Sequence, residues 1–153
     1  MGGTIVCGVS ESAEGRGAAE LASALGARLG LRLVLVSVVD GVPASAEESL
    51  TGRQRQSGAE RRLHSIAREL GDDIETRIVL GERAEALAQV AAEEGADLLV
   101  VGSRPSGLGS RKIRSALARE LEAVTTVPML VAPPSTRKRS EQRLAVAADV
   151  GGR

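Results

Sequence analysis

Apolar residues recur along this chain in five short runs that alternate with longer segments of helical periodicity. Four runs are nearly continuous stretches of Val, Leu and Ile, which is typical of parallel strands buried on both faces. The third run instead alternates apolar and polar residues, as a strand at a sheet edge does. We therefore predict five strands, at residues 4–9, 31–39, 74–80, 97–101 and 127–132.

Between these runs, apolar residues return every three or four positions, which is the spacing of one helix face. Gly30 follows the first such segment and is expected to end its helix as a C-terminal cap. The spacing predicts helices at residues 13–29, 46–70, 84–94 and 111–124, the second with a polar, frayed first half.

Strands that alternate with helices of crossover length require a parallel sheet with right-handed connections. The predicted fold is therefore α/β: a single doubly wound domain with a five-stranded, mainly parallel sheet and helices on both faces. Pro133 and Pro134 stop the last strand, so we assign residues 1–134 to the domain and 135–153 to a mobile tail. The alternative for this basic tail is a short arm that binds nucleic acid or membrane.

Composition narrows the classes of function. Lys plus Arg and Asp plus Glu both number 20, which argues against a dedicated nucleic-acid binder. Phe, Tyr and Trp are absent, so the chain offers no aromatic platform for stacking bases or a flavin ring. The apolar runs are too short to span a bilayer, and the first residues do not resemble a secretory signal. We therefore expect no membrane partner. The single cysteine, Cys7, allows no intrachain disulfide, which fits a cytoplasmic protein.

Three sequence segments stand out within residues 4–134. The first is Ile-Val-Cys-Gly-Val-Ser at residues 5–10, before a helix of small residues. The second is Asp-Leu-Leu-Val-Val-Gly-Ser-Arg at residues 97–104, preceded by Gly-Glu-Arg-Ala at residues 81–84, and the third is Val-Pro-Met-Leu-Val at residues 127–131. Together these segments resemble the universal stress protein family. The resemblance implies the strand order 3-2-1-4-5 and a homodimer formed through the last strand, at Val127, Met129, Leu130 and Val131.

One branch of that family binds ATP through a Gly-x-x-Gly motif after the fourth strand, followed about nine residues later by Gly-Ser or Gly-Thr. Here Gly102 is kept, but Pro105 and Arg114 stand where the resemblance implies glycine, and the intervening segment is one residue short. Ser10 replaces an aspartate at the end of the first strand, while Ser115 is retained. Each lost N–H contact to phosphate costs about 1.5–3 kcal/mol, so the site is expected to be degenerate.

The candidate ligand is ATP or another adenine nucleotide, bound weakly with a dissociation constant above about 10 μM. Ligands of such sheets bind beyond the carboxyl ends of the strands, where the strand order reverses. Arg104 and Arg114 would recover part of the lost affinity through their charge, and Gly107 and Gly109 would form a rearranged loop. The candidate cofactor-binding residues are Val9, Ser10, Val38, Val101, Gly102, Arg104, Gly107, Gly109, Arg114, Ser115 and Ala116.

No catalytic residue and no metal ligand set is predicted. His64 is the only histidine, so it has no second imidazole with which to share a metal and no obvious nucleophile to activate. Cys7 lies within the first strand and is expected to be a small buried hydrophobe. The leading hypothesis is a non-catalytic stress-response protein that acts through binding, with an unidentified protein partner. The alternatives are an ATP-dependent sensor and a weak ATPase.

Overall fold

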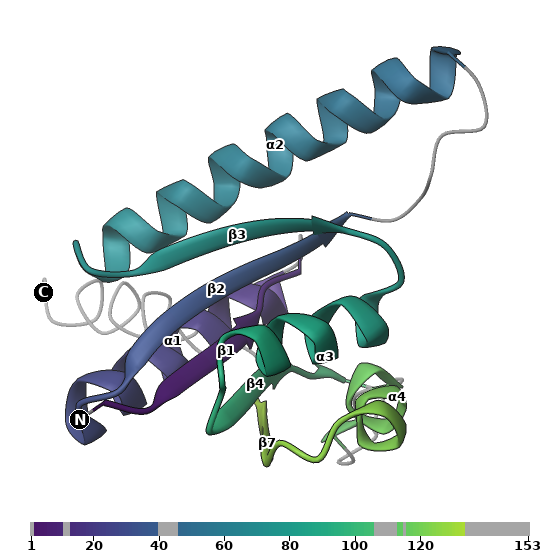
Figure 1. Ribbon diagram of the computed structural model, residues 1–153. Coiled ribbons are helices and arrows are strands. Elements are labelled where there is room, and N and C mark those ends of the chain that lie inside the picture. The colour runs from purple at the N-terminus through teal and green to yellow at the C-terminus, as the bar shows by residue number, and fades with distance from the viewer. Residues whose placement is uncertain (1, 11–12, 40–45, 106–112, 115, 134–153) are drawn as a thin grey trace, which may run out of the picture.

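The computed structural model describes residues 2–10, 13–39, 46–105, 113–114 and 116–133. The predicted tail at 135–153 therefore lies outside the described residues. Five strands form one sheet in the order β3-β2-β1-β4-β7, and every neighbouring pair is parallel (Figure 1). These strands are β1 (Thr4–Gly8), β2 (Arg32–Val39), β3 (Glu75–Leu80), β4 (Leu98–Gly102) and β7 (Met129–Ala132).

This order confirms the predicted fold class and strand order. The first and fourth predicted strands are neighbours at the centre, and the third and last are the two edges of the five-stranded sheet. Branched aliphatics dominate the central strands because both faces are covered, and Leu99, Val100 and Val101 of β4 are fully buried.

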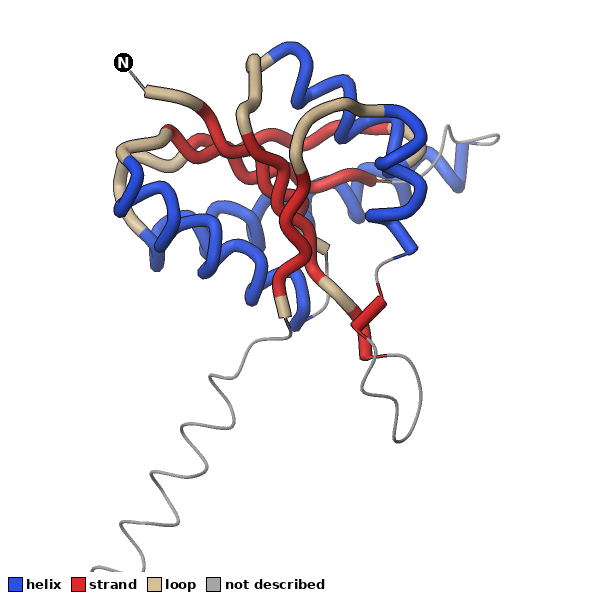
Figure 2. Tube along the Cα trace, turned by 90° about the horizontal axis from the view of Figure 1, so that it is seen from below, coloured by secondary structure: helices blue, strands red, loops and turns tan. Residues whose placement is uncertain are grey.

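Helices cover both faces of the sheet, as Figure 2 shows. One buried cluster joins β1 and β2 to α1 and α2, and a second lies beneath α3 and α4 on the opposite face. Gly30 ends α1 with a φ of 66°, which confirms the predicted cap. The helices are α1 (Ala13–Leu29), α2 (Ala46–Leu70), α3 (Arg83–Glu93) and α4 (Ala116–Val124).

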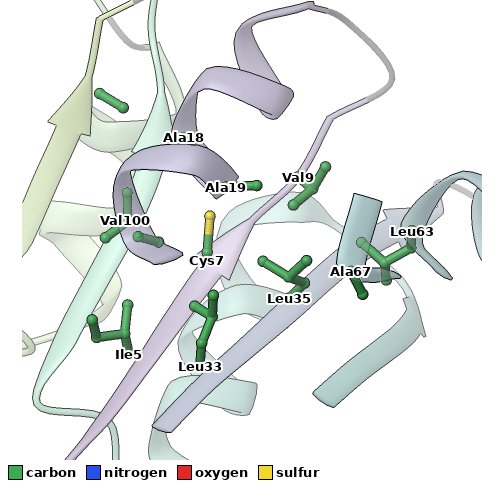
Figure 3. Close-up of a cluster of buried hydrophobic side chains, with 12 residues drawn as sticks. Ile5, Cys7, Val9, Ala18, Ala19, Leu33, Leu35, Leu63, Ala67 and Val100 are labelled. Carbon is green, nitrogen blue, oxygen red and sulfur yellow. The ribbon is translucent and has the colours of Figure 1, made fainter. Parts of the chain in front are cut away.

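The α1 face of the core is built from small side chains. Figure 3 shows Cys7 pointing toward the turn of α1 that carries Ala18 and Ala19, and all three residues are fully buried. Alanine lets the helix backbone lie close to the sheet, so the core reaches tight packing without any aromatic side chain. Burial raises the pKa of the Cys7 thiol to about 12, and the prediction of a buried hydrophobic cysteine is confirmed.

The predicted helix at 111–124 begins too early. The helix starts at Ala116, and the preceding described residues form strand β6 (Ile113–Arg114), which pairs antiparallel with strand β5 (Arg104–Pro105). Pro105 favours strand β5 because proline restricts the residue before it, here Arg104, to extended conformations. Ile113 therefore belongs to a short hairpin and not to the inward face of α4.

An ion-pair network joins α3 to the edge half of the sheet. Arg32 donates to Glu75 at 2.8 Å and to Glu94 at 2.5 Å, and Arg77 donates to Glu93 at 2.8 Å and to Glu94 at 3.2 Å. Hydrogen bonding to Arg77 lowers the pKa of Glu93. These contacts lie near the amino ends of β2 and β3, at the opposite end of the sheet from the candidate site.

None of the described helices is both long and apolar enough to cross a bilayer.

Candidate functional site

The candidate site is the edge of the sheet where the carboxyl ends of β1 and β4 lie side by side. Their ladder pairs Cys7 with Val100, so two residues further on Val9, which directly follows β1, lies at the level of Gly102, the last residue of β4. The chain passes from β1 to β2 on one side, whereas β4 pairs with β1 on the other. Ligands of doubly wound sheets bind in the crevice at such a reversal of strand order.

The end of β1 is held firmly in place. The backbone N–H of Val9 donates to the carbonyl of Val36 at 2.8 Å, and the Val9 side chain is only 7% exposed. A Cβ placed on Gly8 would lie 3.0 Å from Leu87 Cδ1, so α3 packs directly against the strand backbone. The strand therefore delivers Ser10 to the sheet edge along a fixed path.

Ser10 is wedged against the first turn of α1. A Cβ placed on Gly15 would lie 2.5 Å from both the backbone nitrogen and the backbone oxygen of Ser10. Only glycine permits this approach, since ordinary contacts between carbon and other heavy atoms begin near 3.5 Å. Ser10 is half-buried, and its position is set by this glycine contact.

The sheet separates several of the predicted site residues. Val9 belongs to the core cluster under α1 and α2, whereas Val101 belongs to the cluster under α3 and α4. Val38 is half-buried against that second cluster. Because the sheet lies between the two clusters, Val9 cannot line a common wall with Val38 and Val101. These valines pack in the core beside the strand ends, where Val9 and Gly102 lie at the same level of the sheet.

The hairpin brings two predicted arginines together. In the ladder of β5 and β6, Arg104 is the partner of Arg114 and Pro105 is the partner of Ile113. The hairpin leaves β4 two residues after Gly102 and returns just before α4, which begins at the exposed Ala116. Gly107, Gly109 and Ser115 lie outside the described residues.

Ser103 and Gly15 are two positions that the sequence analysis did not single out. The Ser103 hydroxyl donates to the carbonyl of Ala132 at 2.7 Å and is 1% exposed, so it ties the end of β4 to β7 immediately before the hairpin. A serine directly after a buried apolar run was the available signal. For Gly15, the signal was a glycine in the first turn of a helix. Glycine lowers helix stability relative to alanine, so its presence there indicates that another part of the chain approaches the helix backbone closely.

The site carries little acid–base chemistry among the described residues. His64 is exposed on α2, and Cys7 is buried with a thiol whose pKa burial raises to about 12. No group of three His, Cys, Asp or Glu side chains within the described ranges could hold a metal ion.

The universal stress protein family model matches residues 1–133. Among functionally curated proteins, none matches the sequence.

Solved universal stress proteins share the fold. One, in complex with cAMP, is 24% identical with a TM-score of 0.62, and the match covers 87% of this chain and 98% of that one. The protein from Archaeoglobus fulgidus in complex with dAMP is 19% identical with a TM-score of 0.61, covering 85% and 97%. A family member from Arabidopsis thaliana with AMP bound is 19% identical with a TM-score of 0.60, covering 88% and 94%.

Proposed function

Because the chain belongs to the universal stress protein family, we propose that it is a non-catalytic regulatory protein that binds an adenine nucleotide weakly. The binding site in this proposal is the carboxyl edge of β1 and β4, with the hairpin of β5 and β6 above it. Related structures with cAMP, dAMP and AMP support an adenine nucleotide as the ligand class.

The observation that carries the proposal is the ladder register of Arg104 opposite Arg114. Two like charges at one position of an antiparallel ladder destabilise it, and a bound anion would remove that repulsion. Arginine also matches phosphate geometry through its rigid fork of N–H donors. In the ATP-binding branch of the family, glycines at the positions of Pro105 and Arg114 let the backbone contact phosphate. In this proposal the charged side chains of Arg104 and Arg114 take over that role.

The consequence is a phosphate site built from charge in place of a glycine-rich loop. Long side chains lose rotamer freedom when they bind, and this loss opposes binding. Exposed charges are also screened by salt, unlike the N–H groups of a tight loop. The affinity is therefore expected to be weak and dependent on ionic strength, with a dissociation constant for ATP above about 10 μM.

Calorimetry on a double variant tests this assignment. Arg104→Gln with Arg114→Gln should weaken ATP binding at least tenfold, since one charged hydrogen bond contributes about 1.5–3 kcal/mol. The matched control is Arg28→Gln with Arg83→Gln, two exposed arginines on other elements, which should change the affinity less than twofold. Equal losses in both variants would show a general charge effect and would refute the arginine site.

We also propose a two-fold dimer through the edge strand β7. Met129, Leu130 and Val131 are only partly buried in the single chain, and β7 has a neighbour on one side only within the described sheet. An open edge of this kind favours pairing with a second copy. Sedimentation at tens of micromolar protein should show a dimer, and Leu130→Asp should dissociate it. A monomer at that concentration would contradict the proposal.

A further inference from the structure

Helix α2 is much longer than the sheet region it covers. Its 25 residues span about 37 Å, whereas the eight residues of β2 span about 26 Å. Figure 1 shows the amino-terminal part of α2 reaching past the ends of β2 and β3. The buried residues Ala59, Leu63 and Ala67 all lie in its second half, and residues 53–58 have no buried member. The projecting part therefore stabilises little of the described core.

A basic stripe runs along the solvent side of this helix. Arg53, Arg61 and Arg68 are separated by eight and seven residues, which places them within about 80° of one another around the helix axis. All three are exposed, and they lie away from the face that buries Leu63. Together they span about 22 Å of helix. We call these three residues the α2 stripe.

The stripe arginines differ from the arginines that stabilise the fold. Arg16, Arg32 and Arg77 each form ion pairs with carboxylates of other elements. No such pair involves a stripe arginine within the described part of the chain. Glu60, which borders the stripe in the described part of α2, forms no ion pair with it. Three guanidinium groups on a rigid helix are thus left to bind an external anion.

The composition of the stripe identifies the chemistry of that anion. A membrane-binding helix needs large apolar side chains beside its basic ones, and the residues between the stripe arginines on this face are Ser57 and His64. Single-stranded nucleic acid needs aromatic platforms, and the chain has no Phe, Tyr or Trp. Affinity for duplex DNA grows with the number of phosphates that Lys and Arg neutralise, and the stripe supplies only three such charges.

We propose that the α2 stripe docks an acidic helix of a partner protein, whose carboxylates lie about two helical turns apart. Carboxylates spaced in this way match the separations between the stripe arginines, and each guanidinium can bind a carboxylate through two parallel hydrogen bonds. Arg53 precedes the buried residues of α2, whereas Arg61 and Arg68 lie on the solvent side of its packed half, so a partner helix would lie along the outer face of α2.

The probe is an alanine-based helical peptide of about 20 residues that carries Glu at every fourth position, titrated at low ionic strength. The intact protein should bind it with a dissociation constant below about 1 mM. Replacing all three stripe arginines with Gln should weaken binding about tenfold, since an exposed ion pair is worth up to about 1 kcal/mol. Replacing them with Lys keeps the charge and should cost less than threefold.

The matched control replaces Arg28, Arg55 and Arg83 with Gln, three exposed arginines outside the stripe with the same total charge. This control should bind the peptide within twofold of the unmodified protein. Three results would each overturn the proposal: equal weakening by both triple variants, no binding of the peptide at 1 mM, or tighter stripe-dependent binding of duplex DNA or anionic vesicles.

Discussion

The contact between Gly15 and Ser10 makes a sharp prediction about stability. Alanine normally stabilises a helix relative to glycine by about 0.4–1 kcal/mol, because it reduces the conformational freedom of the unfolded chain. At Gly15, however, the added Cβ would lie 2.5 Å from two backbone atoms of Ser10. A backbone atom cannot rotate away as a side-chain tip can, so either α1 or the end of β1 must move.

The size of the effect follows from comparing the two terms. Overpacking a well-packed region costs about 1–3 kcal/mol, and two backbone contacts at this distance favour the upper half of that range. After subtracting the helix gain, we expect Gly15→Ala to lower the free energy of unfolding by about 1–2.5 kcal/mol. Gly58 of α2 provides the matched control, since a Cβ there would meet nothing nearer than Arg62 Nη2 at 4.0 Å. Gly58→Ala should therefore stabilise the protein by about 0.4–1 kcal/mol.

Urea unfolding of the two variants and of the unmodified protein measures whether each substitution raises or lowers the free energy of unfolding. The same change of residue should shift the midpoint in opposite directions, and the thermal midpoint should move by about 2–4 °C per kcal/mol. Because Ser10 lies at the candidate site, Gly15→Ala should also weaken nucleotide binding, whereas Gly58→Ala should leave it unchanged. A Gly15→Ala protein as stable as the Gly58→Ala protein would refute the reasoning.

Other predictions follow from the network of polar contacts and from Cys7. Asp97 Oδ2 accepts a hydrogen bond from the Thr4 N–H at 2.9 Å, so Asp97→Ala should cost about 1–3 kcal/mol in urea unfolding, and Asp97→Asn less. Arg77 lowers the pKa of Glu93 below its ordinary value of 4.5, so this stabilisation is complete above that pH and is lost as the pH falls. Arg77→Gln should therefore reduce the loss of stability measured below about pH 5. Cys7, with a pKa of about 12, should resist an aromatic disulfide reagent at pH 8 until urea unfolds the protein; prompt reaction of the native protein would contradict its burial.

The fold was predictable because its signals are local and agree with one another. Continuous aliphatic runs identify buried parallel strands, and their alternation with helices leaves few topologies. The start of α4 was not predictable in the same way. Ile113, Leu117, Leu121 and Val124 follow helical spacing, yet Ile113 pairs with Pro105 in the hairpin. A contact between residues on either side of a loop leaves no periodic trace in the sequence.

The location of the candidate site stays a prediction, but the arrangement of the strands behind it followed from the sequence. Parallel strands place their carboxyl ends at one edge of the sheet, so the neighbouring ends of β1 and β4 followed from the topology. The sequence did not predict that the sheet separates Val9 from Val101. In a run that is apolar on both faces, the pattern of residues does not indicate which face each side chain occupies. The register of Arg104 with Arg114 likewise depends on the hairpin.

Titration of ATP and adenosine into the unmodified protein by calorimetry tests the central claim most directly. The account predicts one site, an ATP dissociation constant above about 10 μM, and at least tenfold weaker binding of adenosine, because phosphate charge supplies much of the affinity. ATP binding should also weaken as salt is raised. Protein that purifies with stoichiometric ATP, or that binds adenosine as tightly as ATP, would contradict a weak site built on arginine charge.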